Sequence, residues 1–158
     1  MMYVLAILAV FFLGMQCIDA LVTLLFSVRL KQGSFSTSDR VSVLIPARNE
    51  EKKIGLLLEQ LILNKNIHEI LIYNDESTDQ TSPVVQDFQK KDSRISLIQG
   101  SSLPKGWLGK NHACDALSKR AQGNYFLFLD ADVILYDDLI EDVLSYLKAK
   151  RLGLVSLF

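Results

Sequence analysis

The stretch YFLFLDAD, residues 125–132, is an apolar run that ends in two aspartates separated by one alanine. Consecutive apolar residues without alternation are typical of a strand buried on both faces of a parallel sheet, and we expect such a strand here. Asp130 and Asp132 then lie at the carboxyl edge of that sheet, where ligands bind in open α/β folds. Both carboxylates can point the same way at this spacing, which suits a hard divalent cation.

Strand and helix patterns alternate along the rest of the chain. Short apolar or β-branched runs predict further strands at 41–45, 69–73, 95–98 and 152–158. Apolar residues at helical spacing predict the intervening helices, which begin near Asn49, Ser82, Lys110 and Asp137 or Asp138. This alternation predicts a mostly parallel sheet with right-handed crossovers and helices on both faces.

The N-terminal residues 1–30 differ in composition from everything that follows. Between Tyr3 and Val28 the only charged residue is Asp19, and this apolar length is enough to span a bilayer. A basic region follows directly, so the positive-inside tendency places the remaining chain in the cytoplasm. We therefore predict a single transmembrane helix in residues 1–30, a cell-membrane location and a polar linker at 31–40.

A signal peptide and a soluble core helix are the two alternatives to a membrane span. A signal peptide fits less well because the basic leading region is missing and the apolar stretch is too long. A soluble core helix is disfavoured by the same length. Gln16 and Asp19 argue against a simple span, because an acid at mid-span costs about 2.5–3.5 kcal/mol on insertion scales. They face a partner helix, or the segment lies shallow in the membrane.

Composition excludes several classes of protein. A length of 158 residues suffices for one domain with a sizeable core. The formal net charge of −1 argues against a general nucleic-acid binder. Cys17 and Cys114 are far apart and belong to no Cys/His cluster, so neither a zinc site nor a disulfide framework is indicated.

Four polar clusters follow strands or precede helices, at 46–50, 74–77, 109–111 and 130–132. In a parallel sheet such positions gather at one edge. Each cluster alone is weak evidence for a binding site, because a lone acid after a strand is more often a turn or cap residue. Together they predict one crevice in which the paired acids hold a metal, while Lys110 and the first N–H groups of its helix hold a phosphate. Neither a GxGxxG pattern nor a Walker loop is present.

Two further residues complete this hypothesis. Asp75 can accept a hydrogen bond from the N–H of a nucleobase, with Arg48 or Glu50 framing the base. The alternative for Arg48 is an ion pair with Glu51 or Asp75.

The motifs IPARNEE (45–51), NDESTDQT (74–81), GWLGKNHA (106–113) and FLDADV (128–133), at this spacing, resemble a known family. They look like the nucleotide-sugar-binding half of a family 2 glycosyltransferase with the GT-A fold. The resemblance covers 41–158 and implies an incomplete, truncated domain of that Rossmann-like fold. Within the family, the motifs are most similar to bacterial membrane-associated carotenoid (diaponeurosporenoate) glycosyltransferases.

The resemblance implies a nucleotide-diphosphate sugar donor, of the uridine type. Ala47 and Glu50 would lie at the nucleoside, and Asp75 would meet the uracil. Asp132 would bind Mg²⁺ or Mn²⁺, and Asp130 would contact the ribose or the metal. The donor-binding residues expected on this basis are Pro46, Ala47, Arg48, Glu50, Asp75, Lys110, Asp130 and Ala131. 

The chain departs from the family pattern at two positions. Glu76 stands where glycine is usual, and a turn that needs a positive φ would be strained there. Asn74 stands where many members have a second aspartate. Neither departure removes Asp75.

We therefore expect a metal-dependent, inverting transfer of sugar to a lipid or another membrane-proximal acceptor. Such a transfer needs a general base, which the resemblance places beyond Phe158, so this chain alone is expected to be inactive. The alternative is a non-catalytic nucleotide-sugar-binding membrane fragment left by truncation. A nucleotidyltransferase is a third reading, but it would show a glycine-rich loop after the first strand, and 46–51 contains no glycine.

Overall fold

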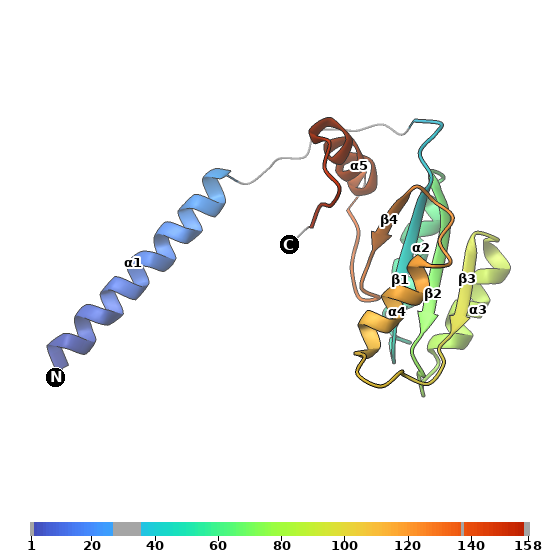
Figure 1. The fold of residues 1–158 in the computed structure, drawn as a ribbon, viewed down its shortest axis with the longest axis horizontal. Coiled ribbons are helices and arrows are strands. Elements are labelled where there is room, and N and C mark those ends of the chain that lie inside the picture. Colours follow the sequence, from blue (N-terminus) through green and yellow to red (C-terminus); the bar gives the residue numbers. More distant parts are fainter. Residues whose placement is uncertain (1, 27–35, 137, 157–158) are drawn as a thin grey trace.

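The computed structural model describes residues 2–26, 36–136 and 138–156, which form a long N-terminal helix and an α/β domain (Figure 1). The strands are β1 (Val41–Ala47), β2 (Ile67–Asn74), β3 (Ile95–Gln99) and β4 (Tyr125–Phe128). The helices are α1 (Met2–Phe26), α2 (Ile54–Leu63), α3 (Thr81–Lys91), α4 (Gly109–Ser118) and α5 (Leu139–Lys150). All strand pairs are parallel, and the strand order is β3-β2-β1-β4.

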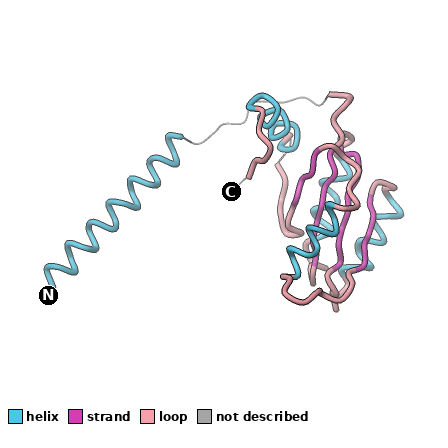
Figure 2. The backbone as a smooth tube through the Cα atoms, viewed as in Figure 1, coloured by secondary structure: helices cyan, strands magenta, loops and turns pink. Residues whose placement is uncertain are grey.

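Helices cover both faces of this sheet, as the alternating pattern predicts (Figure 2). On one face, Val43 and Ile45 of β1 pack in the same cluster as Leu58 of α2. On the other face, Leu44 packs with Leu117 of α4. Successive residues of β1 thus point into opposite layers, as expected for a central strand buried on both sides.

The strand β4 differs from its prediction. Phe126 and Phe128 are each 46% exposed, while Tyr125 and Leu127 pack against the core, so only one face of β4 is buried. The predicted strand at 152–158 is not formed in its described part, residues 152–156. No described strand therefore covers the outer edge of β4. An uninterrupted apolar run does not by itself show whether both faces will be covered, because that depends on neighbouring elements.

Several helices begin away from their predicted caps. Asn49 has a left-handed φ of 57°, and α2 starts only at Ile54 with Lys53 in the N-cap position. The helix α3 starts at Thr81 rather than at Ser82. Asp138 does precede α5, but its side chain makes no capping hydrogen bond; Asp137 lies outside the described residues. Residues at helix starts are drawn into tertiary contacts, so local capping rules misplace them.

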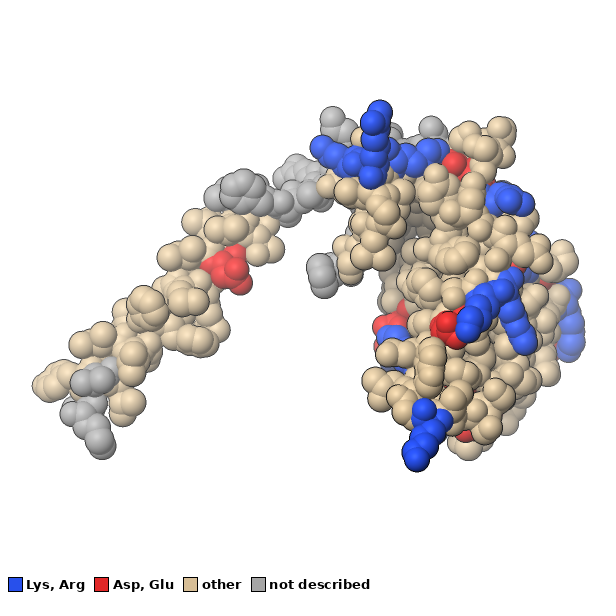
Figure 3. All heavy atoms as spheres, viewed as in Figure 1, with Lys and Arg blue, Asp and Glu red and all other residues tan. Residues whose placement is uncertain are grey.

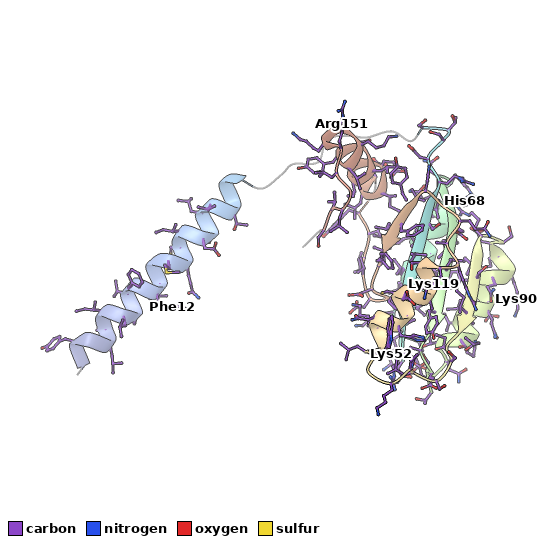
Figure 4. All side chains as sticks on the ribbon, viewed as in Figure 1. Phe12, Lys52, His68, Lys90, Lys119 and Arg151 are labelled. Carbon is purple, nitrogen blue, oxygen red and sulfur yellow. The ribbon has the colours of Figure 1, made fainter. Side chains whose placement is uncertain are left out.

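The helix α1 is apolar and exposed. Its stretch Leu5–Thr23 has a mean hydropathy of 2.3 and no buried residue, so it is long and apolar enough to cross a membrane. By sequence, Asp19 is the only acidic residue of this helix, which otherwise carries no red or blue atoms in Figure 3. Figure 4 shows side chains such as Phe12 projecting into open space. This exposure argues against a soluble core helix. The basic residues Arg29 and Lys31, on which the predicted orientation depends, lie outside the described residues.

The end of the predicted linker, residues 36–40, is tied to the α/β domain. Lys148 Nζ donates to Asp39 Oδ2 at 2.8 Å, and Arg40 N donates to Asn124 Oδ1 at 2.8 Å. Burial alone would raise the pKa of Asp39, but hydrogen bonds from Lys148 and Ser36 outweigh it and lower that pKa. The packed domain therefore begins a few residues before β1.

Candidate functional site

A cleft of about 450 Å³ opens at the carboxyl edge of the sheet, where β1, β2 and β4 end and α4 begins. It gathers every residue that the sequence predicted for the site: Pro46, Ala47, Arg48, Glu50, Asp75, Lys110, Asp130, Ala131 and Asp132. Gly109 and Ala113 of α4 complete the lining. Two cavities of similar size lie elsewhere, one between α2 and the start of α5 and one apolar cavity between β4 and α5. Neither contains any of the predicted site residues.

The ends of β1 and β2 form one wall of the cleft. Their register pairs Ala47 with Asn74, and the backbone N–H of Asp75 donates to Ala47 O at 2.9 Å. The Asp75 side chain is only 15% exposed, and Arg48 Nη1 lies 3.6 Å from its Oδ2. Arg48 thus makes the ion pair that was one of its two predicted roles. Its side chain is 62% exposed, so this contact contributes little to stability.

Hydrogen bonds lock the loop after β1 to the loop after β2. Asn49 N donates to Ser77 Oγ at 3.0 Å, and Thr78 N donates back to Asn49 Oδ1 at 2.8 Å. Glu50 N donates to Thr81 Oγ1 at 2.8 Å. Glu76 has a left-handed φ of 52°, which is the conformation that glycine favours. These bonds hold the wall of the cleft in one arrangement in spite of that strained residue.

The start of α4 forms another wall of the cleft and comes very close to Asp75. A Cβ added to Gly109 would lie 2.7 Å from Asp75 Oδ2, so only glycine fits without a shift. Helix N-termini leave their first N–H groups without intrahelical partners, and Gly109 and Lys110 of this first turn line the cleft. The sequence placed Gly109 in a polar cluster, but its steric role depends on the fold.

The loop 100–108 is held against α4 by one ring cluster. Ser101 N donates to Tyr73 Oη at 3.3 Å, and Tyr73 Oη lies 3.3 Å from His112 Nδ1. Trp107 contacts the His112 ring edge-on, with the ring centroids 5.7 Å apart. These contacts fix where α4 begins relative to β2.

The two acids after β4 each carry a lysine partner. Lys110 Nζ lies 2.5 Å from Asp130 Oδ1, and Lys53 Nζ lies 3.1 Å from Asp132 Oδ2. The hydrogen bond to Asp130 raises the pKa of Lys110, and the hydrogen bond to Asp132 raises the pKa of Lys53. The same Lys53 contact lowers the pKa of Asp132. Sequence reasoning missed Lys53. The available signal was a basic residue at a helix start, where the helix dipole disfavours a cation.

Asp130 and Asp132 are the candidate ligands for a divalent cation in this cleft. Among the described residues, no group of three or more His, Cys, Asp or Glu side chains could hold a metal alone. Asp130 and Asp132 offer hard oxygen donors, and both side chains are about half exposed to the cleft. Mg²⁺ is commonly held by one or two carboxylates, with waters and substrate phosphates filling its other positions. The residues present therefore fit a cation that binds together with a phosphate ligand.

Residues 42–157 match the family model described as glycosyl transferase family 2. The chain belongs to this family. It is also 30% identical over 129 residues to the 4,4'-diaponeurosporenoate glycosyltransferase of Staphylococcus haemolyticus (strain JCSC1435). That match covers 80% of this chain and 34% of the relative, so the chain spans about a third of the relative's length. The family prediction is therefore confirmed, and the staphylococcal relative belongs to the predicted carotenoid branch.

Solved structures share the fold of this family 2 domain. The structure of S. aureus TarS 1–349 superposes with a TM-score of 0.58 at 27% identity, covering 71% of this chain and 33% of that one. The mannosyltransferase PcManGT from Pyrobaculum calidifontis, in complex with GDP-Man and Mn²⁺, gives a TM-score of 0.60 at 20% identity. That match covers 74% of this chain and 36% of PcManGT. These likenesses confirm the predicted GT-A fold in an incomplete form.

Proposed function

We propose that this chain is the nucleotide-sugar-binding half of a membrane-anchored, metal-dependent, inverting glycosyltransferase. The donor is a uridine-diphosphate sugar, and the acceptor is a lipid or another membrane-proximal molecule. The observation that carries the proposal is the gathering of all the predicted donor-site residues around one cleft at the carboxyl edge of the sheet. Family membership and the shared fold of PcManGT, which was solved with GDP-Man and Mn²⁺, support it.

In this proposal, the nucleoside lies against the ends of β1 and β2. Asp75 is largely buried at the wall of the cleft, so its carboxylate can accept a hydrogen bond from the ring N–H of the base with little competition from water. Ala47 is buried at the edge of the cleft, and Glu50 lines the same wall. Arg48 frames the base from the exposed side, next to its contact with Asp75.

The diphosphate then lies between α4 and the two acids. Lys110 and the free N–H groups at the start of α4 offer positive charge and donors to the phosphate oxygens. Asp130 and Asp132 would hold Mg²⁺ or Mn²⁺, which supplies neutralising charge for the departing diphosphate. Lys110 loosens from Asp130 as the phosphates enter, because its ion pair is more than half exposed.

The helix α1 anchors the donor-binding domain to the cell membrane in this proposal, with the domain in the cytoplasm. Its length, hydropathy and exposure support a single span. Only residues 27–40 separate α1 from β1, so a membrane-embedded α1 would keep the cleft near the bilayer, where an apolar acceptor is found.

Donor binding is tested by calorimetry on the full chain in detergent micelles, with UDP titrated in the presence of Mn²⁺. Asp132→Ala should weaken UDP binding at least about tenfold, since a lost metal ligand typically costs that much or more. Asp87→Ala is the matched control, because Asp87 is an exposed acid that pairs with Lys90 on α3. Equal affinity for UDP in wild type and Asp132→Ala would refute the metal role.

A companion titration with GDP tests the base preference, and tighter GDP binding would refute the uridine assignment. Sugar transfer by this chain alone is expected to be absent, because the general base is assigned to no residue up to Phe158. Turnover by the chain would contradict that expectation and exclude the non-catalytic alternative.

A further inference from the structure

Lys53 breaks the local rules of helix formation. It occupies the N-cap position of α2, where its ammonium group has no acceptor to offer the first N–H groups of the helix. Ser, Thr, Asp and Asn are strongly preferred at that position, and a cation is unfavourable at the positive end of the helix dipole. Departures of this kind tend to occur where function requires them. The side chain of Lys53 instead reaches Asp132, a residue 79 positions away in sequence.

The contact between Lys53 and Asp132 is a tertiary ion pair at the proposed cation site. Nζ donates to Oδ2 at 3.1 Å, while the side chains of Lys53 and Asp132 remain 57% and 48% exposed. An exposed pair of this kind is weak and can be exchanged for another partner. It nevertheless neutralises one of the two carboxylates that the donor site offers to a cation.

We propose that Lys53 is the internal counter-ion of Asp132, so that it lowers the affinity of the site for a free divalent cation. The inference rests on the proposed function, in which Asp132 is a cation ligand. A cation that approaches Asp132 must displace the ammonium group and then remains close to its positive charge. The negative charges of a nucleoside diphosphate compensate both the metal cation and the Lys53 ammonium group. Lys53 therefore couples the two ligands, so that cation and diphosphate bind more tightly together than separately.

The test measures Mn²⁺ binding by the electron paramagnetic resonance signal of free Mn²⁺, titrated against the full chain in detergent micelles. Lys53→Met should bind Mn²⁺ alone roughly two- to fivefold more tightly than wild type, the range expected from losing one exposed ion pair. Lys53→Arg should match wild type, because it keeps the charge. Lys52→Met is the matched control: this adjacent lysine (Figure 4) is also exposed, and its removal should change Mn²⁺ affinity by less than about twofold.

Repeating the titration with saturating UDP measures the coupling. UDP should tighten Mn²⁺ binding by a larger factor in wild type than in Lys53→Met. In the variant, the Lys53 ammonium group is missing, so the diphosphate has no opposing positive charge to offset. Lys53→Asn is a second variant that removes the charge and supplies a preferred N-cap residue, and urea unfolding of both variants checks that they are folded. It should also bind Mn²⁺ alone more tightly than wild type.

Asp132→Asn distinguishes a failure of the proposed role of Lys53 from a failure of the proposed metal site. If Asp132→Asn weakens Mn²⁺ binding but Lys53→Met and Lys53→Asn leave it unchanged or weaken it, the role of Lys53 is overturned and the proposed donor site stands. If Asp132→Asn binds Mn²⁺ as wild type does, the metal role of the proposed function fails, and the inference about Lys53 fails with it.

Discussion

Replacing Gly109 by alanine should separate the geometry of the cleft from the stability of the fold. The added Cβ would lie 2.7 Å from Asp75 Oδ2 and 3.6 Å from its Cγ, so the Asp75 carboxylate must turn away. A side chain about 30° from its preferred rotamer costs about 0.5–1.5 kcal/mol. Alanine is the better helix former, by less than about 1 kcal/mol at this first position of α4, which partly offsets this cost. The free energy of unfolding should therefore change by less than about 1 kcal/mol.

Donor binding should respond much more strongly than stability. In the proposed function, Asp75 accepts a hydrogen bond from the base, and a displaced carboxylate loses that bond. A hydrogen bond to a charged group contributes about 1.5–3 kcal/mol. The Kd of UDP should therefore rise roughly 10- to 150-fold in Gly109→Ala.

Two measurements on the full chain in micelles check this prediction. Calorimetry with UDP and Mn²⁺ gives the affinity, and the fluorescence of Trp107, the single tryptophan, follows unfolding. Gly55→Ala is the matched control, because its Cβ would lie at ordinary contact distances of 3.6 Å from Val84 and 3.7 Å from Phe88. It should stabilise the fold by about 0.5–1 kcal/mol without affecting UDP binding.

Two results would refute the reasoning about Gly109. Wild-type affinity in Gly109→Ala would show that the position of the Asp75 carboxylate does not matter for the donor. A loss of stability above about 2 kcal/mol would show that the backbone of α4, and not the side chain, moves to relieve the contact.

Two further predictions concern Arg94, whose guanidinium donates to the carbonyls of Ile62 and Asn64 at the end of α2. Arg94→Met should lower the free energy of unfolding by about 2–4 kcal/mol in urea, while the exposed control Lys90→Met (Figure 4) should change it by less than about 0.5 kcal/mol. An unchanged urea midpoint in Arg94→Met would contradict the helix-end role. The hydrogen bond from Arg94 also lowers the pKa of Asp92 below its ordinary value of 3.8. Because the pKa of Asp92 is lower in the folded than in the unfolded protein, the ionised carboxylate stabilises the fold at pH values above 3.8. This contribution is lost as the pH falls below 3.8 toward the pKa of the folded state. The loss of stability in that acid range, measured by urea unfolding, should therefore be smaller in Arg94→Met than in wild type.

The elements of the domain could largely be predicted from local pattern. Ile54, Leu57, Leu58 and Leu61 recur at helical spacing, and all four are buried on the face of α2 that meets the sheet. The positions of the polar clusters at strand ends could also be predicted, because the apolar runs stop directly before them. These signals are readable because helix and strand periodicity are properties of a few consecutive residues.

Other features were decided only when the strands took their order. With β1 between β2 and β4, Ala47 comes next to Asn74 on one side, and the acids after β4 join the same edge on the other. The same order leaves β4 at the edge with Phe126 exposed, which its apolar sequence did not reveal.

The sequence by itself determined the alternation of strands and helices, the family and most of the residues that line the cleft. Only the tertiary structure decided that Gly109 abuts Asp75, that Lys53 reaches Asp132 and that one face of β4 stays open. The physical reason is that these contacts join residues far apart in sequence. They depend on strand order and register, which no local pattern of residues encodes.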